Sequence, residues 1–297
     1  MIAEIRRYRS SFKNWPSVTY KMYTGRDTIK CELKSGTVIE TDKELVSFLS
    51  YFLELGVIDD NQVSKVLSDG ILEFSYASNN VLMKVYDRER KMPLGDLLPI
   101  FFKNDYKFLT QGTQTLVDVG ANIGDSSIYF ALNGISHIIA LEPYPFSFKI
   151  AQHNIKVNKL SDHIDLINAA YGNDGTIEIE DKANTPGSDL VHYNGGITVD
   201  VMSLRTLIGR YGLEKENMAL KMDCEGCEYN LVSEGKDILS LFKKIQIEYH
   251  YGVKDLGNIL SKSGFKVKAT SPVKSYNPSS SSPEMQVGFI YAERQIE

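Results

Sequence analysis

A short segment near the middle of the chain carries the first residues that could do chemistry. Residues 116–125 read LVDVGANIGD, an apolar run broken by Gly120 and Gly124, and a helix-like stretch follows from Ser126. A strand, a glycine turn and a helix in this order present free backbone N–H groups to a ligand at the helix N-terminus. The segment predicts a ligand-binding turn, with a plain strand-turn-helix of another α/β protein as the alternative.

The residue types in this turn indicate which ligand it takes. A dinucleotide-binding turn has the pattern G-x-G-x-x-G, but Asn122 replaces its second glycine, so the backbone could not approach a pyrophosphate closely. Asp118 would repel a phosphate and could hold an amine. S-adenosylmethionine, which has an adenosine, an amino-acid tail and no phosphate, fits these features better.

Two further strand ends complete the expected cofactor site. Residues 137–143 read HIIALEP, an apolar strand ending at Glu142. This acid lies roughly 20 residues past the glycine turn, where a carboxylate can accept hydrogen bonds from both ribose hydroxyls. The next strand, predicted over 163–172, contains Asn168 and Ala169 at its end, where short side chains would let an adenine ring lie against the backbone.

Residues at the ends of two later strands could act on a substrate. Parallel sheets bind ligands beyond the carboxyl ends of their strands, and these two strands contribute Asp223, Glu225, Glu248 and His250. Methyl transfer to an alcohol requires an aligned oxygen and a base that removes its proton. Asp223 is the first candidate for this base and His250 the second. A helix cap at Asp223 and a structural histidine at His250 are the alternatives.

The same region could also hold a metal. A zinc site would use the two cysteines of CEGC (224–227) with His250, but one C-x-x-C pair is a weak signal, and buried thiols are the favoured interpretation. The carboxylates of Asp223, Glu225 and Glu248 would suit Mg²⁺. We predict no metal ligand here and keep Mg²⁺ as the alternative.

From residue 115 onward, the sequence patterns of strands alternate with those of helices. This alternation predicts a parallel sheet with helices on both faces. The connection over 271–286, between the sixth strand (265–270) and the seventh (287–295), has no helical pattern, so those strands should be antiparallel neighbours. We expect this Ser-rich connection to be a mobile lid. The predicted fold class is α/β, a Rossmann-like, mostly parallel seven-stranded sheet with an antiparallel last strand.

The chain before this pattern predicts a small N-terminal α+β appendage. The expected domains are therefore 1–110 and 111–297. The basic opening predicts a surface helix, with an amphipathic membrane anchor as the alternative. A helix over 42–56, capped at its start, and a hairpin over 71–87 follow.

Composition limits the classes of function. The chain of 297 residues has a net charge of −5, so it lacks an overall basic footprint for nucleic acid. No apolar run approaches the ~18 residues that a membrane-spanning helix needs, and the N-terminus has no signal-peptide pattern. Three cysteines do not suggest a disulfide framework. Together these features favour a cytoplasmic protein.

The motifs taken together resemble a known enzyme family. VDVGANIGD, ALEPYP, NAAYG, LKMDCEGCE and IEYH, in this order and spacing over about residues 100–270, resemble the FkbM family of S-adenosylmethionine-dependent methyltransferases. The better-understood members methylate hydroxyls of sugars and macrolide-type natural products. The resemblance implies the class I methyltransferase fold. It also implies that the methionine end of the cofactor is held by Asp118, Gly120, Asn122 and Gly124. The ribose would be held by Glu142, and the adenine edge by Asn168 and Ala169.

The expected function is S-adenosylmethionine-dependent O-methylation of a sugar, a glycan or another small molecule. One alternative is an RNA (tRNA) methyltransferase, because HNIKVNKL (153–160) also resembles tRNA guanine methyltransferases of this fold. Those enzymes carry an N-P-P-type motif where this chain has DCEG (223–226), so a nucleic acid acceptor is disfavoured. The other alternative is a non-catalytic protein that binds the cofactor.

Overall fold

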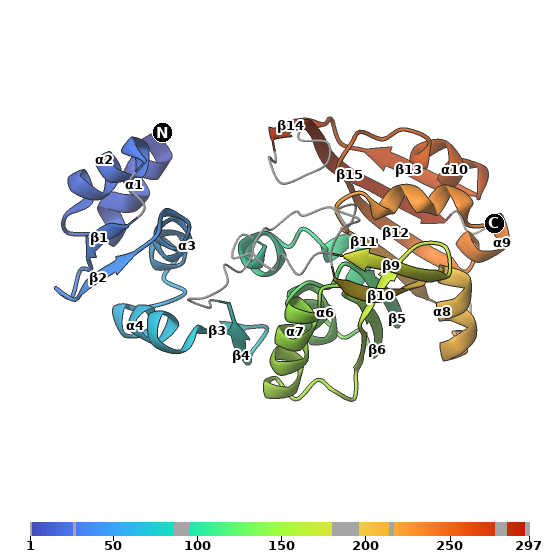
Figure 1. Cartoon of the computed structure of the whole chain (residues 1–297), viewed down its shortest axis with the longest axis horizontal. Coiled ribbons are helices and arrows are strands. Elements are labelled where there is room, and N and C mark those ends of the chain that lie inside the picture. Colours follow the sequence, from blue (N-terminus) through green and yellow to red (C-terminus); the bar gives the residue numbers. More distant parts are fainter. Residues whose placement is uncertain are drawn as a thin grey trace. The chain divides into compact units, whose positions relative to one another are not determined.

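The chain folds as two compact units, Met1–Leu97 and Leu98–Glu297 (Figure 1). The computed structural model describes residues 2–25, 28–85, 96–179, 196–213, 217–276 and 284–294. The sequence analysis places the division at residue 110, whereas the contacts place it before the π-helix η1 (Leu98–Lys103) and helix α5 (Lys107–Thr110). Lys244 and Gln246 of the second unit donate hydrogen bonds to the backbone carbonyls of Phe108 and Asp105, at 2.9 and 3.0 Å, and so hold this segment in the second unit.

The N-terminal unit is a small α+β unit, as expected. Tyr8, Phe12 and Leu49 are buried in it, and its first and third helices pack together. Its elements are α1 (Ile2–Ser11), α2 (Trp15–Thr24), β1 (Ile29–Glu32), β2 (Val38–Thr41), α3 (Lys43–Glu54), α4 (Asp60–Asp69), β3 (Ile71–Tyr76) and β4 (Asn79–Lys84).

Three of the predictions for the N-terminal unit are confirmed. Asp42 caps α3 by accepting a hydrogen bond from the backbone N–H of Leu45 at 2.8 Å. Strands β3 and β4 pair as an antiparallel hairpin. The basic opening, expected as a surface helix, forms helix α1, of which only Arg7, Tyr8 and Ser11 are buried. Arg7 donates a hydrogen bond to Ser50 of α3 at 2.9 Å, and α2 and the β1–β2 hairpin follow in the chain.

The second unit is built on one mostly parallel sheet with the strand order β13-β15-β12-β11-β5-β6-β7. The five strands from β12 to β7 in this order are parallel, and β15 is antiparallel to both β12 and β13. The expected seven-stranded sheet with a reversed last strand is confirmed. Its strands are β5 (Thr115–Val119), β6 (His137–Leu141), β7 (Ile164–Ile167), β11 (Met218–Met222), β12 (Phe242–Tyr249), β13 (Phe265–Ala269) and β15 (Glu284–Arg294).

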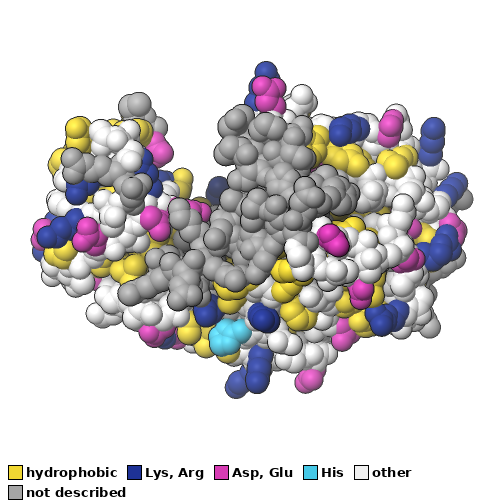
Figure 2. Space-filling view, in the orientation of Figure 1, with side chains coloured by type: hydrophobic (Ala, Val, Ile, Leu, Met, Phe, Trp, Pro, Cys, Tyr) yellow, Lys and Arg dark blue, Asp and Glu magenta, His cyan; other side chains and the backbone are white. Residues whose placement is uncertain are grey.

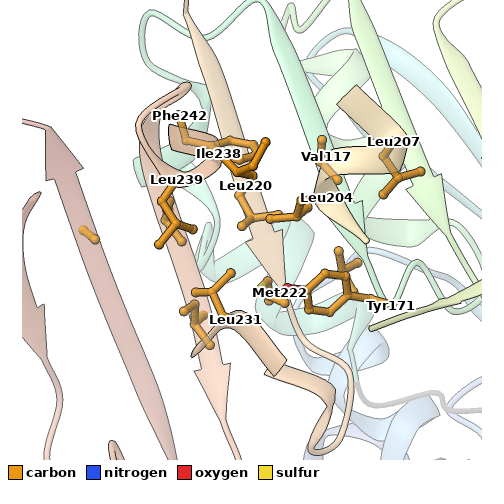
Figure 3. Close-up of a cluster of buried hydrophobic side chains, with 14 of the residues drawn as sticks. Val117, Tyr171, Leu204, Leu207, Leu220, Met222, Leu231, Ile238, Leu239 and Phe242 are labelled. Carbon is orange, nitrogen blue, oxygen red and sulfur yellow. The ribbon is translucent and has the colours of Figure 1, made fainter. Parts of the chain in front are cut away.

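One face of the sheet forms a continuous apolar core (Figure 3). Leu220 and Met222 of β11 lie among side chains of α8 (Leu204–Tyr211), the 3₁₀-helix η2 (Cys227–Ser233) and α9 (Lys236–Leu239). Helix α10 (Leu256–Lys262) packs against β13 and η2 and extends this layer. Fully burying a side chain of this size stabilises the fold by about 1.5–3 kcal/mol. All five residues of β11 are buried, as expected for a central parallel strand.

The opposite face of the sheet is buried but partly polar. Asp118 of β5, Lys221 of β11 and Gln246 of β12 lie side by side in register. Gln246 donates a hydrogen bond to the carbonyl of Asp105 at 3.0 Å, so the segment between η1 and α5 covers this face. Helix α6 (Asp125–Leu132) follows the glycine turn and contacts α7 (Pro145–Val157).

The third predicted strand is in fact two strands that belong to different sheets. β7 ends at Ile167, and β8 (Ala169–Tyr171) pairs with β10 (Ile197–Met202), which in turn pairs with β9 (Gly175–Ile179). The break falls at Asn168, whose side chain donates to the carbonyls of Glu142 and Pro143 at 2.8 and 2.9 Å. These bonds hold the chain at the edge of the large sheet, and a second sheet begins directly after them.

The expected lid is partly regular structure. Strand β14 (Val273–Tyr276) pairs with the start of β15, so the two ends of the 271–286 connection form a ladder. Residues 277–283, where the Ser-rich stretch lies, are outside the described residues. Among the helices that the structure describes, none is both long enough and apolar enough to cross a bilayer.

Candidate functional site

The glycine turn after β5 lies directly against the end of β11. Gly120 has a φ of +83°, and a Cβ at this position would lie 1.8 Å from the backbone oxygen of Asp223. The backbone N–H of Asp223 donates to the carbonyl of Val119 at 3.1 Å. The structure therefore brings the predicted cofactor-binding turn next to the first candidate for the catalytic base.

The rest of the turn connects to the end of β6. Asn122 has a φ of +47°, and its backbone N–H donates to the Glu142 carboxylate at 2.7 Å. Gly124 begins α6 with a φ of +84°, and a Cβ there would lie 3.3 Å from the Cα of Ala151 in α7. The turn is thus held between a buried acid on one side and a closely packed helix on the other.

Glu142 is a buried acid at a strand end. Its carboxylate also accepts a hydrogen bond from the backbone N–H of Tyr144 at 2.9 Å, and the residue is 4% exposed. Burial raises the pKa of Glu142 to about 7, although the N–H groups of Tyr144 and Asn122 and the charge of Lys221 act in the opposite direction. Asn168 is tied to the same strand end, as described above, and Ala169 is fully buried beside it.

The carboxylate of Asp118 is bound by other side chains of the protein. It is fully buried, accepts hydrogen bonds from the hydroxyls of Ser126 and Ser127 at 2.6 Å, and lies 3.1 Å from the ammonium of Lys221. Lys221 also donates to the carbonyl of Gly120 at 2.7 Å. Burial alone would lower the pKa of Lys221, but the charges of Asp118 and Asp223 outweigh it and raise that pKa above its ordinary value.

Three of the four candidate catalytic side chains meet at the ends of β11 and β12. One oxygen each from Asp223 and Glu225 and one nitrogen of His250 lie within 4.8 Å of one another. His250 is 3% exposed, and its Nε2 is 3.3 Å from Glu225 and 3.7 Å from Asp223. The fourth candidate, Glu248, is on the face of β12 that carries Gln246 and is not part of this cluster.

A buried glutamate orients His250 from behind. The Nδ1 of His250 lies 3.1 Å from Glu228, which is fully buried and also accepts a hydrogen bond from the backbone N–H of His250 at 3.0 Å. Burial alone would lower the pKa of His250. The hydrogen bond to Glu228 and the charges of Glu225 and Asp223 outweigh burial and raise that pKa to about 10. In the unliganded protein at neutral pH, the ring is therefore an imidazolium that cannot accept a proton.

Sequence reasoning missed three residues of this site. Tyr106 donates from its hydroxyl to Asp223 at 3.3 Å, Lys221 pairs with Asp118, and Glu228 holds His250. Lys221 could have been found as a lysine within an otherwise apolar run, and Glu228 as a second acid close after Asp223. Tyr106 ends the lead-in segment GDLLPIFFKNDY (95–106), but nothing in its spacing points to Asp223.

The expectation of buried thiols in the CEGC segment is wrong. Cys224 and Cys227 form a disulfide with a Cα–Cα distance of 5.5 Å, so neither is a thiolate that could bind zinc with His250. The predicted helix after this segment is the 3₁₀-helix η2. Cys31, in the N-terminal unit, is a buried thiol, and burial raises its pKa to about 12.

The sheet has a reversed last strand in this strand order, a glycine turn after β5 and a buried acid at the end of β6. Together these features define a class I methyltransferase fold. The model of the methyltransferase FkbM domain matches residues 118–267, about half of the chain. The protein belongs to this family and is an S-adenosylmethionine-dependent methyltransferase. The family, the fold and the kind of enzyme expected from the sequence are thus confirmed.

Solved structures with low sequence identity are also similar. The methyltransferase domain of METTL16 is 13% identical, has a TM-score of 0.47, and matches over 90% of this chain and 87% of that one. TYW2 of M. jannaschii, solved with AdoMet, is 14% identical, has a TM-score of 0.39, and matches over 77% and 88%. Precorrin-6y C5,15-methyltransferase from Geobacter metallireducens GS-15 is 15% identical, has a TM-score of 0.38, and matches over 65% and 88%. No curated protein matched the sequence.

Proposed function

We propose that this enzyme methylates a hydroxyl group of a sugar, a glycan or another small molecule. The observation that carries the proposal is the cluster of Asp223, Glu225 and His250 directly beside the glycine turn. An alcohol must lose a proton as it is methylated, and a carboxylate within hydrogen-bond reach can take it. The acidic cluster suits such a neutral acceptor better than it suits the phosphates of a nucleic acid.

The described part of the face drawn in Figure 2, together with the net charge, supports this choice of acceptor. Figure 2 shows acidic and basic side chains interspersed over the described part of the face that it draws. Proteins that bind RNA usually gather lysine and arginine into a patch or stripe. The net charge of −5 is also unfavourable for a polyanion.

The residues of the turn fit the cofactor of the family. Gly120, which has no room for a Cβ, and Asn122 and Gly124 would hold the methionine end, Glu142 the ribose, and Asn168 with Ala169 the adenine edge. Asp118 would position the site without touching the cofactor, since its carboxylate holds Lys221 and the first turn of α6 in place. When bound, the cofactor supplies an electrophilic methyl group.

Asp223 would orient the acceptor hydroxyl and receive its proton. Tyr106 holds one of its oxygens, and the protonated His250 lies near the other. At neutral pH the imidazolium of His250 could not itself act as the base. Glu225 would stabilise this imidazolium.

Binding of S-adenosylhomocysteine is expected to weaken as the pH falls below about 7. Ribose hydroxyls donate to an ionised Glu142 better than to a protonated one, and the pKa of this carboxyl is about 7 in the unliganded protein. Affinity should therefore be highest above this pH and fall as the pH drops through it. Calorimetry between pH 5.5 and 8.5 measures this effect.

Two variants of Glu142 test its role in this effect. Glu142→Gln should abolish the pH dependence, and Glu142→Ala should weaken binding by about 1–3 kcal/mol. A wild-type affinity that does not change with pH would remove Glu142 from the ribose site.

The acceptor class can be tested by transfer of a deuterated methyl group. Purified enzyme is incubated with S-adenosylmethionine whose transferable methyl group is deuterated. Separate reactions contain, as acceptors, the glycans that co-purify with the enzyme, a panel of free sugars, or tRNA. We expect mass spectrometry to find the added methyl group on a hydroxyl of a glycan or a small molecule. Methylation of tRNA alone would favour the RNA methyltransferase. Cofactor binding without transfer to any of these would favour a non-catalytic binding protein.

A further inference from the structure

Three side chains at the carboxyl ends of β11 and β12 present one ligand atom each to a common point. These atoms are Oδ1 of Asp223, Oε2 of Glu225 and Nε2 of His250, with the nitrogen 3.7 and 3.3 Å from the two oxygens. One imidazole nitrogen and two carboxylate oxygens form a donor set for a divalent first-row metal. Such a set leaves other coordination positions for substrate and water.

Glu228 gives the histidine the orientation of a metal ligand. Its carboxylate accepts a hydrogen bond from Nδ1–H of His250, so Nε2 is the nitrogen that faces Asp223 and Glu225. A bound cation would replace the proton on Nε2. Histidines that bind metals almost always donate their other N–H to a carboxylate, a carbonyl or water in this way. Glu228 is itself held by the backbone N–H groups of Gly226 and His250 at 2.7 and 3.0 Å.

The two carboxylates are also held in position. The Cys224–Cys227 disulfide closes a four-residue loop that contains Glu225. The hydroxyl of Tyr106 binds Oδ2 of Asp223, while Oδ1 is the oxygen that faces His250. A site whose ligands are already oriented loses little conformational entropy when a cation binds.

The charge around this point favours a cation. Asp223, Glu225 and Glu228 surround one imidazole ring, so three carboxylates lie close to a single basic group. A divalent cation bound between Asp223, Glu225 and Nε2 would offset more of this negative charge than one proton on the ring does.

We propose that Asp223, Glu225 and His250 bind one divalent first-row cation, with Mn²⁺ preferred to Mg²⁺. Mg²⁺ is usually held by carboxylate, phosphate and water oxygens, so the imidazole nitrogen of His250 disfavours it relative to a first-row cation such as Mn²⁺. This set differs from the one considered in the sequence analysis, because His250 takes the place of Glu248. Glu228 is the positioning residue of the site.

The catalytic role of the cation rests on the proposed O-methylation. The acceptor hydroxyl would occupy an open coordination position, where the cation makes it more acidic. Its proton passes to Oδ2 of Asp223 as the oxygen forms a bond to the methyl carbon. The carbon–sulfur bond breaks, and its electron pair stays on the sulfur of S-adenosylhomocysteine. Asp223 thus acts both as a ligand through Oδ1 and as the base through Oδ2.

The test is Mn²⁺ binding to the full-length protein after dialysis against EDTA, followed through the loss of the electron paramagnetic resonance signal of free Mn²⁺. We expect one Mn²⁺ per chain in the wild type. Glu225→Gln and His250→Gln should lose stoichiometric binding, and Glu228→Gln should lower the affinity about 10–100-fold. Glu225 is 28% exposed, so Glu225→Gln is the variant least able to disturb folding. Each variant must still bind S-adenosylhomocysteine in calorimetry.

His137→Gln is the matched control. His137 pairs with Asp165 at 2.8 Å, but both residues are exposed, and His137 lies at the start of β6, away from the carboxyl ends of the strands. This variant should bind Mn²⁺ like the wild type.

The proposed cation site would be overturned by either of two results. These are a wild type that does not bind Mn²⁺, or Glu225→Gln and His250→Gln variants that bind it as well as the wild type does. Methyl transfer that is unchanged by EDTA would overturn the catalytic role of the cation while leaving O-methylation intact. Mn²⁺ binding without methylation of any hydroxyl would leave the site and overturn the proposed function.

Discussion

Replacing Asp223 with asparagine is expected to lower turnover by about 10²–10⁴-fold, the usual contribution of general-base catalysis. Asparagine keeps the size of the side chain and an oxygen that can face His250, but it has no carboxylate to receive the proton of the acceptor. The affinity for S-adenosylhomocysteine should stay nearly unchanged, because the backbone of Asp223, which the substitution leaves in place, lies against the glycine turn. Turnover is measured at saturating S-adenosylmethionine with the acceptor found in the transfer experiment.

Asp237→Asn is the control for this substitution. Asp237 is an exposed acid whose carboxylate pairs with the exposed Arg205 at 2.7 Å, so its loss should leave turnover within experimental error. The competing assignment makes His250 the base and Asp223 a structural residue. It would be supported if Asp223→Asn turned over like the wild type while His250→Ala was inactive.

Replacing Gly120 with alanine is expected to lower the free energy of unfolding by about 2–6 kcal/mol, which combines a strained φ with overpacking. The φ of Gly120 is +83°, which alanine adopts only at a cost, and its Cβ would lie 1.8 Å from the carbonyl oxygen of Asp223. That oxygen belongs to the backbone, so the ends of β5 and β11 would have to separate. Urea denaturation measures the loss of stability. Calorimetry should also show weaker S-adenosylhomocysteine binding, because the turn that would hold it is displaced.

Gly134→Ala separates the two causes of this loss. Gly134 has a similar φ of +89°, but a Cβ there would have no atom within 4 Å. It should therefore cost only the strain of a left-handed backbone, about 1–2 kcal/mol. Equal losses of stability for the two variants would mean that the close approach of Gly120 to Asp223 does not constrain the turn.

Much of the fold could be predicted because it depends on local patterns of apolar and polar residues. Apolar runs such as those of β5 and β11 predict buried parallel strands, and the connection before β15 has no helical pattern, which predicts the reversal of that strand. The break of the third strand could not be predicted, because it depends on bonds from Asn168 to carbonyls about 25 residues earlier in the chain. The disulfide could not be predicted either, since one C-x-x-C pair fits a thiol pair, a metal site or a bond, and the loop geometry decides between them.

Local sequence patterns are enough to predict which residues come to the carboxyl edge of the sheet. Strand ends are set by short-range periodicity, and parallel strands place all such ends on one side, so Gly120, Glu142 and Asp223 had to lie there. The tertiary structure decided which side chains meet at that edge. His250 turns toward Glu225 and Glu228 while Glu248 is left on another face, and Tyr106 reaches Asp223 from 117 residues away. The physical reason is that the direction of a side chain beyond a strand end is set by the groups packed around it, and these come from distant parts of the chain.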